Sequence, residues 1–229
     1  MKHLVLCLKY AGLILLCFPA ESQNIISLNL GPFYKSEKIA LGESLSTPDS
    51  LTLHQLRFYL GHFTFYQNNA AILEDKNYHL FDLEEASTLN LTFNLPQNAT
   101  FDSLAFNLGV DSLTTASGAM GGDLDPTQGM FWTWQSGYIN VKMEGFSKKC
   151  PARNGEFQFH LGGYLPPYAA NQRVELKTGG NSENLLLTLD LAPFFEQVNW
   201  VDKHNVMSPG AEAVRLSGIL AKSFAIHAQ

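Results

Sequence analysis

The stretch that decides the fold is residues 51–60, which read LTLHQLRFYL and alternate apolar with polar side chains, with one slip in phase. Successive side chains of an extended chain point to opposite faces of a sheet, so this pattern predicts a β-strand with one buried face. Similar short runs recur and predict further strands. They cover residues 26–30, 63–66, 90–95, 103–108, 138–144, 156–161, 173–176 and 185–191.

The segments between these runs are clusters of Gly, Pro, Asn and Asp, which supply the backbone geometry that turns require. About nine short strands with no helix regularly between them are typical of an all-β domain. The predicted fold is an antiparallel β-sandwich, with an open barrel as the alternative.

Two kinds of segment interrupt the strand pattern. Residues 111–129 are rich in glycine and too long for an ordinary hairpin connection, so we expect a long glycine-rich loop with a functional role. Residues 193–198 predict a short helix. Ser208 and Pro209 suit the N-cap and the first position of a short C-terminal helix that continues to about residue 223.

The N-terminus reads as a secretory signal peptide over residues 1–22, with Lys2 near its start, an apolar run, and small residues at the cleavage positions. A lipoprotein signal is the alternative, because Cys17 follows the apolar run, but the large Leu16 before it disfavours a lipobox. We therefore expect a periplasmic or secreted protein rather than an outer-membrane lipoprotein. After cleavage, residues 23–229 would form one domain with no integral membrane segment.

The composition excludes several classes of function. The chain has 229 residues, of which 45% are hydrophobic and 16% charged, enough for a sizeable core. Its net charge is −6 and it has no long basic cluster, which excludes nucleic acid as a partner. Signal cleavage would remove Cys7 and Cys17 and leave Cys150 alone, which excludes an intramolecular disulfide and a thiolate zinc site.

Motifs for catalysis are also missing from the sequence. The chain contains no GxSxG, HExxH, P-loop or dinucleotide-binding pattern, and its acidic residues form no pair fixed by spacing. Because no nucleophile, base and orienting residue can be grouped, we expect a protein that is not an enzyme.

The densest group of unusual side chains contains Trp132 and Trp134. On a strand they would share one face, either as core aromatics or as an aromatic wall beside a binding or redox site.

The histidines beyond the signal segment are candidate metal ligands, but none has a local spacing such as HxH or HxxxH. A metal site would therefore combine distant segments. His54 alternates onto the apolar face of its strand and is expected to point inward. His160 lies on the face opposite the phenylalanines of its strand, and His204 precedes the C-terminal helix. Imidazole with a soft neighbour such as Met130 or Met207 would suit copper.

Asp111, Asp123 and Asp125 lie within the glycine-rich loop. Carboxylates in such a loop can bind calcium, although their spacing is not that of an EF-hand. The alternative is that they cap backbone amides in turns.

Five segments in order resemble the MbnP family of secreted copper-binding proteins, which are associated in some members with methanobactin. The segments are residues 56–60, 78–83, 106–111, 125–138 and 159–163. The most specific parts read WTWQSGY, at residues 132–138, and FHLG, at residues 159–162. The resemblance implies a β-sandwich, an envelope location and no catalytic turnover.

The resemblance also implies that histidine binds Cu(I) for copper uptake or storage, in some relatives together with a kynurenine made from tryptophan. A partner dihaem enzyme of the MbnH type, related to peroxidases, makes that modification, and a TonB-dependent receptor is a second expected partner. Carried onto this chain, the resemblance makes His160 the leading ligand and Trp132 or Trp134 the modified residue. Gln128 stands where many relatives carry a histidine, so His204 and His54 are further candidate ligands.

An alternative from another class is a metal-free envelope module that binds sugar or peptide on an aromatic platform. Its residues would be Trp132, Trp134, Tyr138, Tyr164 and Tyr168.

Overall fold

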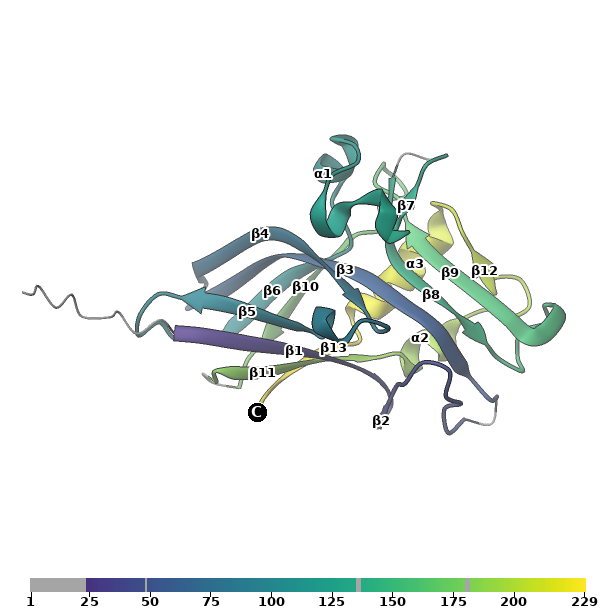
Figure 1. Ribbon diagram of the computed structural model, residues 1–229, viewed down its shortest axis with the longest axis horizontal. Helices are drawn as coiled ribbons and strands as arrows, with labels where there is room; N and C mark the ends of the chain where they lie inside the picture. The colour runs from purple at the N-terminus through teal and green to yellow at the C-terminus, as the bar shows by residue number, and fades with distance from the viewer. Residues whose placement is uncertain (1–23, 48, 135–136, 180–181) are drawn as a thin grey trace, which may run out of the picture.

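The computed structural model describes residues 24–47, 49–134, 137–179 and 182–229. The predicted signal peptide, residues 1–22, lies outside them. Most of the described chain is β-structure in two sheets, which Figure 1 shows. The prediction of a mainly β fold is therefore confirmed, with three α-helices added to the sheets of the described chain.

The smaller sheet is built around its first strand. It contains β1 (Asn24–Tyr34), β2 (Glu37–Lys38), β5 (Asn90–Leu95), β11 (Asn184–Asp190) and β13 (Phe224–Ala228). β1 pairs antiparallel with β2 and β5 and parallel with β11, and β13 pairs antiparallel with β11.

The larger sheet forks along its longest strand. It contains β3 (Thr52–Gln67), β4 (Ala70–Asp82), β6 (Ser103–Leu108), β7 (Phe131–Trp132), β8 (Gly137–Phe146), β9 (Glu156–Gly162), β10 (Gln172–Lys177) and β12 (Asn205–Val206). β4 pairs with one edge of β3, while β8 and β6 pair with successive parts of β3, residues 52–58 and 60–66. One arm continues through β9 to β12 and the other continues to β10.

The expectation of a wholly antiparallel sandwich is wrong at two places. β1 pairs in parallel with β11, and β12 pairs in parallel with β9. Side chains alternate with the same period in parallel and antiparallel strands, so the sequence pattern could not separate the two arrangements.

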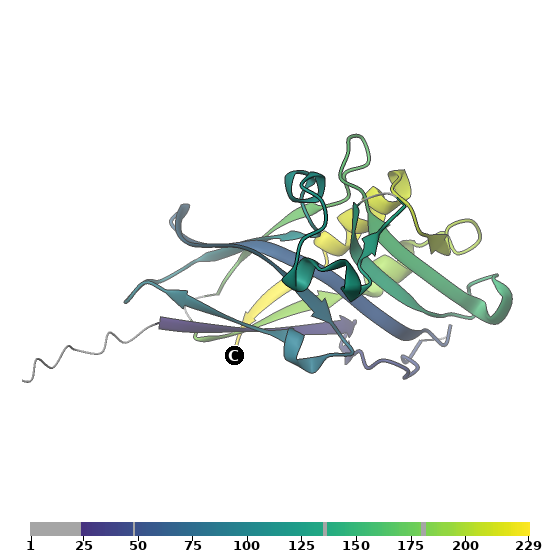
Figure 2. The same ribbon diagram turned by 45° about the horizontal axis from the view of Figure 1, so that its top comes forward.

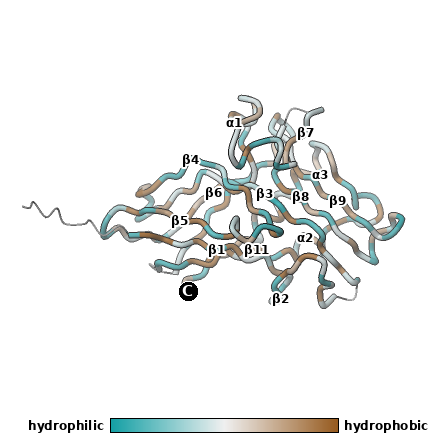
Figure 3. The backbone as a smooth tube through the Cα atoms, viewed as in Figure 1, coloured by the Kyte–Doolittle hydropathy of each residue, from teal (hydrophilic) through white to brown (hydrophobic). Residues whose placement is uncertain are grey.

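The inner faces of the sheets enclose a core that is rich in aromatic rings. Phe63 lies 5.2 Å from Phe93 and 5.4 Å from Phe106 between ring centroids, and all three side chains are buried. Burial of each such ring contributes about 1.5–3 kcal/mol to stability. Figure 3 shows the alternation of apolar and polar residues along the strands that makes this core.

The slip in phase within residues 51–60 is a β-bulge in β3. The pairing with β8 shifts between Leu53 and Gln55, so an extra residue of β3 falls between two paired residues of β8. The bulge keeps Leu53 and Leu56 buried and leaves His54 exposed. The prediction that His54 points inward is therefore wrong, because the bulge reverses the alternation.

Five of the described strands lie outside the predicted runs: the two-residue strands β2, β7 and β12, and the longer strands β4 and β13. The first eight residues of β4 are exposed or half-buried, so polar residues stand on both of its faces and no alternation marks the strand. β13 is a short edge strand of the smaller sheet, and only its first residue, Phe224, is buried.

Both predicted helices are present, as α2 (Ala192–Gln197) and α3 (Ala211–Ala221). α3 buries Ala213, Leu216 and Leu220. Its N-cap is Gly210 rather than the predicted Ser208, so the helix begins two residues later than predicted and Pro209 precedes it. None of the helices in the described ranges is long and apolar enough to cross a bilayer.

Gly61 in β3 provides a test of this packing. A Cβ there would overlap the Tyr78 ring and come within 2.8 Å of the Asn77 carbonyl oxygen, a backbone atom that cannot move away cheaply. We expect Gly61→Ala to lower the free energy of unfolding by about 1–3 kcal/mol, measured by urea denaturation. Gly121→Ala is the matched control, because a Cβ at Gly121 meets nothing within 4 Å. Equal stability of the two variants would contradict the packing described.

Candidate functional site

The predicted glycine-rich loop folds over the outer face of the larger sheet and encloses a second apolar core. The loop contains α1 (Ser112–Ala116) and two short 3-10 turns, and Figures 1 and 2 show α1 and β7 on this outer side. The core between loop and sheet consists of Tyr59, Tyr78, Leu80, Val110, Leu124, Met130, Trp132, Tyr138 and Ile139. The segment is therefore an ordered cover over one face of the sheet.

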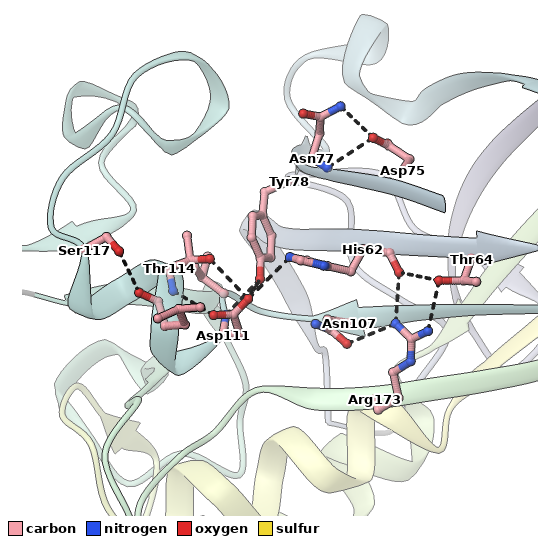
Figure 4. A network of polar contacts seen from close by, with 12 residues as sticks. His62, Thr64, Asp75, Asn77, Tyr78, Asn107, Asp111, Thr114, Ser117 and Arg173 are labelled. Atoms are coloured by element: carbon pink, nitrogen blue, oxygen red, sulfur yellow. Dashed lines mark hydrogen bonds and ion pairs between the residues drawn. The ribbon is translucent and has the colours of Figure 1, made fainter. Parts of the chain in front are cut away.

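The start of the loop is fixed by Asp111, as Figure 4 shows. Its Oδ2 accepts a hydrogen bond of 2.5 Å from the Tyr78 hydroxyl, and its backbone N–H donates back to the same hydroxyl at 3.0 Å. Its Oδ1 accepts the Thr114 N–H at 2.7 Å and so caps α1. Burial alone would raise the pKa of Asp111, but the hydrogen bonds from Thr114 and Tyr78 hold it below its usual value.

His62 reaches the same carboxylate from a strained position in β3. Its φ is 52°, in the left-handed region that non-glycine residues seldom adopt, and its Nε2 lies 3.4 Å from Asp111 Oδ2. Arg173 holds this conformation, because its Nη1 donates to the His62 carbonyl oxygen at 2.9 Å. The pairing of β3 with β4 shifts between Gly61 and Phe63, so His62 lies in a second bulge. Its contacts join β3 and β10 to the base of the loop.

The middle of the loop is tied to the sheet by two tyrosines. The Tyr59 hydroxyl donates to the Asp123 carbonyl oxygen at 3.0 Å, and the Tyr138 hydroxyl donates to the Leu124 carbonyl oxygen at 3.0 Å. The Asp123 carboxylate accepts the Leu80 N–H at 2.9 Å. Burial raises the pKa of both tyrosines, so both hydroxyls remain donors at neutral pH.

The three aspartates proposed for calcium therefore each accept a backbone N–H. Asp125 accepts the Thr127 N–H at 2.8 Å at the start of a 3-10 turn, as Asp111 and Asp123 accept those of Thr114 and Leu80. The bonds of Asp111 and Asp125 are the ones expected of the turn-capping alternative, whereas Asp123 binds the backbone of strand β4. Calcium binding by the loop stays a prediction.

The two tryptophans lie at the end of the loop, one buried and one exposed. Trp132 pairs with Gly137 across β7 and β8 and is 6% exposed, whereas Trp134 is 63% exposed. Their ring centroids are 5.8 Å apart. The Trp132 ring rests on Gly162 of β9, where a Cβ would lie within 2.7 Å of it. Only glycine at this position lets the indole approach the sheet.

His160 lies two residues before Gly162, on the same face of β9. Residues two apart on a strand are about 7 Å apart between Cα atoms. His160 stands opposite Lys142, which in turn stands opposite Arg57. Its Nε2 lies 2.6 Å from Glu144 Oε1, and the side chain is buried. Burial lowers the pKa of His160 even though Glu144 opposes the shift, so the ring is neutral at neutral pH.

The other two candidate histidines lie apart from His160. His204 is the residue before β12. The register of β12 with β9 places it beside Phe157, three residues before His160. Its Nδ1 lies 3.1 Å from the Trp200 carbonyl oxygen. His54 is exposed on β3, with β8 and β9 between it and β12. Gln128 is exposed, and its carbonyl oxygen accepts a hydrogen bond of 3.3 Å from Arg57.

Glu144 is the residue that the sequence analysis missed. It lies in the same predicted strand as Lys142, and the spacing of two places both on one face. Its contact with His160 depends on the register of the β8–β9 pair, which the sequence pattern did not reveal. Over the described ranges, no three His, Cys, Asp or Glu side chains form a cluster that could hold a metal ion.

Comparison with known proteins gives one family. A family model described as MbnP matches residues 23–208. Among solved structures, MbnP from Methylosinus trichosporium is similar, with a TM-score of 0.56 and 17% sequence identity over 83% of this chain and 82% of that one. No curated protein matches the chain significantly.

The Tyr78–Asp111 contact can be tested by pH. Burial, and then the hydrogen bond to Asp111, raise the pKa of Tyr78 to about 12 from an ordinary value of 10.0. The neutral Tyr78 hydroxyl is therefore favoured by the folded state. Its contribution to the free energy of unfolding is fully present below pH 10.0 and is lost as the pH rises through about 12. We expect Tyr78→Phe to cost about 1.5–3 kcal/mol at neutral pH, and the difference from wild type to shrink above pH 10.0. Urea denaturation at several pH values measures it, and a difference independent of pH would contradict the contact.

Proposed function

The chain belongs to the MbnP family, and from this membership we propose that it is an extracytoplasmic copper-binding protein rather than an enzyme. The family match covers residues 23–208, which include the loop, both tryptophans and all three candidate histidines. The proposed role is copper uptake or storage in the periplasm or outside the cell.

The observation that carries the proposal is the place of His160. A buried, neutral imidazole is the form of histidine that binds a metal, and this one lies beside the Trp132–Gly162 contact. Imidazole suits copper and does not suit calcium or magnesium. The residues therefore fit Cu(I) at one ligand. Because no three His, Cys, Asp or Glu side chains of the described residues form a cluster, we propose a donor of another kind beside His160.

Trp132 supplies that donor in this proposal. Conversion to kynurenine breaks the C2–C3 bond of the indole, places one oxygen on each carbon, and releases C2 as formate after hydrolysis. The product carries an aromatic amine and a ketone, either of which can bind copper. Hydrogen peroxide would be the oxidant, with two molecules reduced to water by a dihaem enzyme of the MbnH type as the indole is oxidised. The enzyme would approach from the side of the exposed Trp134, whose ring lies 5.8 Å from that of Trp132.

His204 and His54 are further ligands only if the chain rearranges. His204 would have to leave the Trp200 carbonyl oxygen, and His54 lies across two strands from β12. A TonB-dependent receptor would be the partner if the role is uptake rather than storage.

A second candidate function is a metal-free module that binds sugar or peptide. The exposed rings of Trp134 and Tyr168, 63% and 45% accessible, favour it, because exposed aromatic side chains are common in carbohydrate and peptide recognition. In that case His160 would be a structural partner of Glu144, and copper would bind no tighter than to any surface histidine.

Removal of His160 tests copper binding. We expect wild type to hold about one Cu(I) per chain with a Kd below about 1 µM, and His160→Ala to weaken binding by more than about 100-fold, beyond what outer-shell partners usually contribute. Titration against a competing chelator measures both. His227→Ala is the control, because His227 is exposed on β13 in the other sheet. Equal affinity of the two variants would exclude His160 as a ligand.

Mass spectrometry tests the modification. After co-expression with a dihaem MbnH-type enzyme, we expect the peptide that holds Trp132 and Trp134 to gain one oxygen atom and lose one carbon atom. Fragment ions should place the change on Trp132, because this ring lies against Gly162, near His160. Trp132→Phe should abolish the change while Trp134→Phe retains it at Trp132. The change at Trp134 in wild type would contradict the assignment.

A further inference from the structure

Glu144 lies where it can set which nitrogen of His160 is free. Its Oε1 is 2.6 Å from His160 Nε2, and this is the only hydrogen bond of the ring within the described part of the chain. A carboxylate can only accept hydrogen bonds, so Nε2 carries the proton in this contact. A neutral imidazole has one N–H, and its other nitrogen, Nδ1, then holds a lone pair.

From this contact we propose that Glu144 is a positioning residue, which holds His160 in the Nε2–H tautomer and leaves Nδ1 as the nitrogen that binds the metal. The proposal rests on the copper-binding function proposed above. A histidine ligand commonly donates its second ring N–H to a carboxylate, which fixes both the tautomer and the ring orientation. Here the carboxylate comes from β8 and the imidazole from β9, so the β8–β9 register aligns the pair.

The surroundings of the pair restrict its movement. The His160 side chain is 8% exposed and that of Glu144 is 29% exposed. Lys142 Nζ lies 3.9 Å from the same Glu144 oxygen, so the carboxylate faces a lysine as well as the imidazole. Lys142 is paired across the strands with His160 and lies next but one to Glu144 in β8. These contacts keep Glu144 on the Nε2 side of the ring.

Two other histidines face carboxylates in the described structure, but neither forms such a site. His62 Nε2 is 3.4 Å from Asp111, and its side chain is 35% exposed. His79 Nε2 is 2.7 Å from Asp75 and packs against Phe63 in the inner core. Only His160 combines a short contact with burial and with a tryptophan ring on the same face of its strand.

The first test needs no copper. Long-range proton–nitrogen correlation spectra of the metal-free protein report which imidazole nitrogen is protonated. We expect His160 to show protonated Nε2 and unprotonated Nδ1 at neutral pH. Glu144→Ala should lose this preference, and Glu144→Gln should keep it, because its amide oxygen still accepts a hydrogen bond. A proton on Nδ1 in wild type would overturn the proposal by itself, whether or not any variant folds. An unchanged tautomer in Glu144→Ala would also overturn it.

The second test adds Cu(I) to the same labelled protein. We expect the Nδ1 signal of His160 to shift most, and Glu144→Ala to lower the Cu(I) affinity about 10–100-fold. Glu84→Ala is the control, because Glu84 is an exposed carboxylate that contacts Arg57 and not His160. If copper shifts Nε2 instead, the inference is wrong and the copper-binding function stands. If copper binds nowhere, the proposed function is wrong, and the first test still decides the tautomer.

Discussion

The structure depends on closing one face of the larger sheet. Tyr59, Leu80 and Ile139 project from its outer face, so that face is apolar and needs a cover. The loop between β6 and β8 provides the cover, and its polar backbone must then find hydrogen-bond partners where it leaves water. The hydroxyls of Tyr59 and Tyr138 meet that requirement at the Asp123 and Leu124 carbonyl oxygens.

The candidate site follows from this closure. Once the loop lies on the sheet, its end forms β7 and pairs with the start of β8, which brings Trp132 over Gly162. The same strand, β8, holds Glu144 beside His160 through its pairing with β9. A single strand therefore positions the aromatic ring and the carboxylate around one imidazole, and a shift in its register would separate all three.

The electrostatics of the site also depend on the cover. Burial lowers the pKa of His160 in spite of the adjacent carboxylate, and this favours the neutral imidazole that the proposed copper site needs. The two tryptophans differ in exposure. Trp132 is held within the apolar layer, Trp134 is exposed, and their ring centroids are 5.8 Å apart.

The sequence by itself determined most of the longer strands, the helices α2 and α3, and the family, because alternation and motif content are local properties. It predicted His160 and the tryptophan pair, but it placed His54 inward, and it could not detect the parallel β1–β11 pair or Glu144. Those features depend on a bulge, on strand direction and on register, which arise when distant segments pack. Only the tertiary structure decided that the glycine-rich segment is a cover, because its tyrosine partners are up to 64 residues away in the chain.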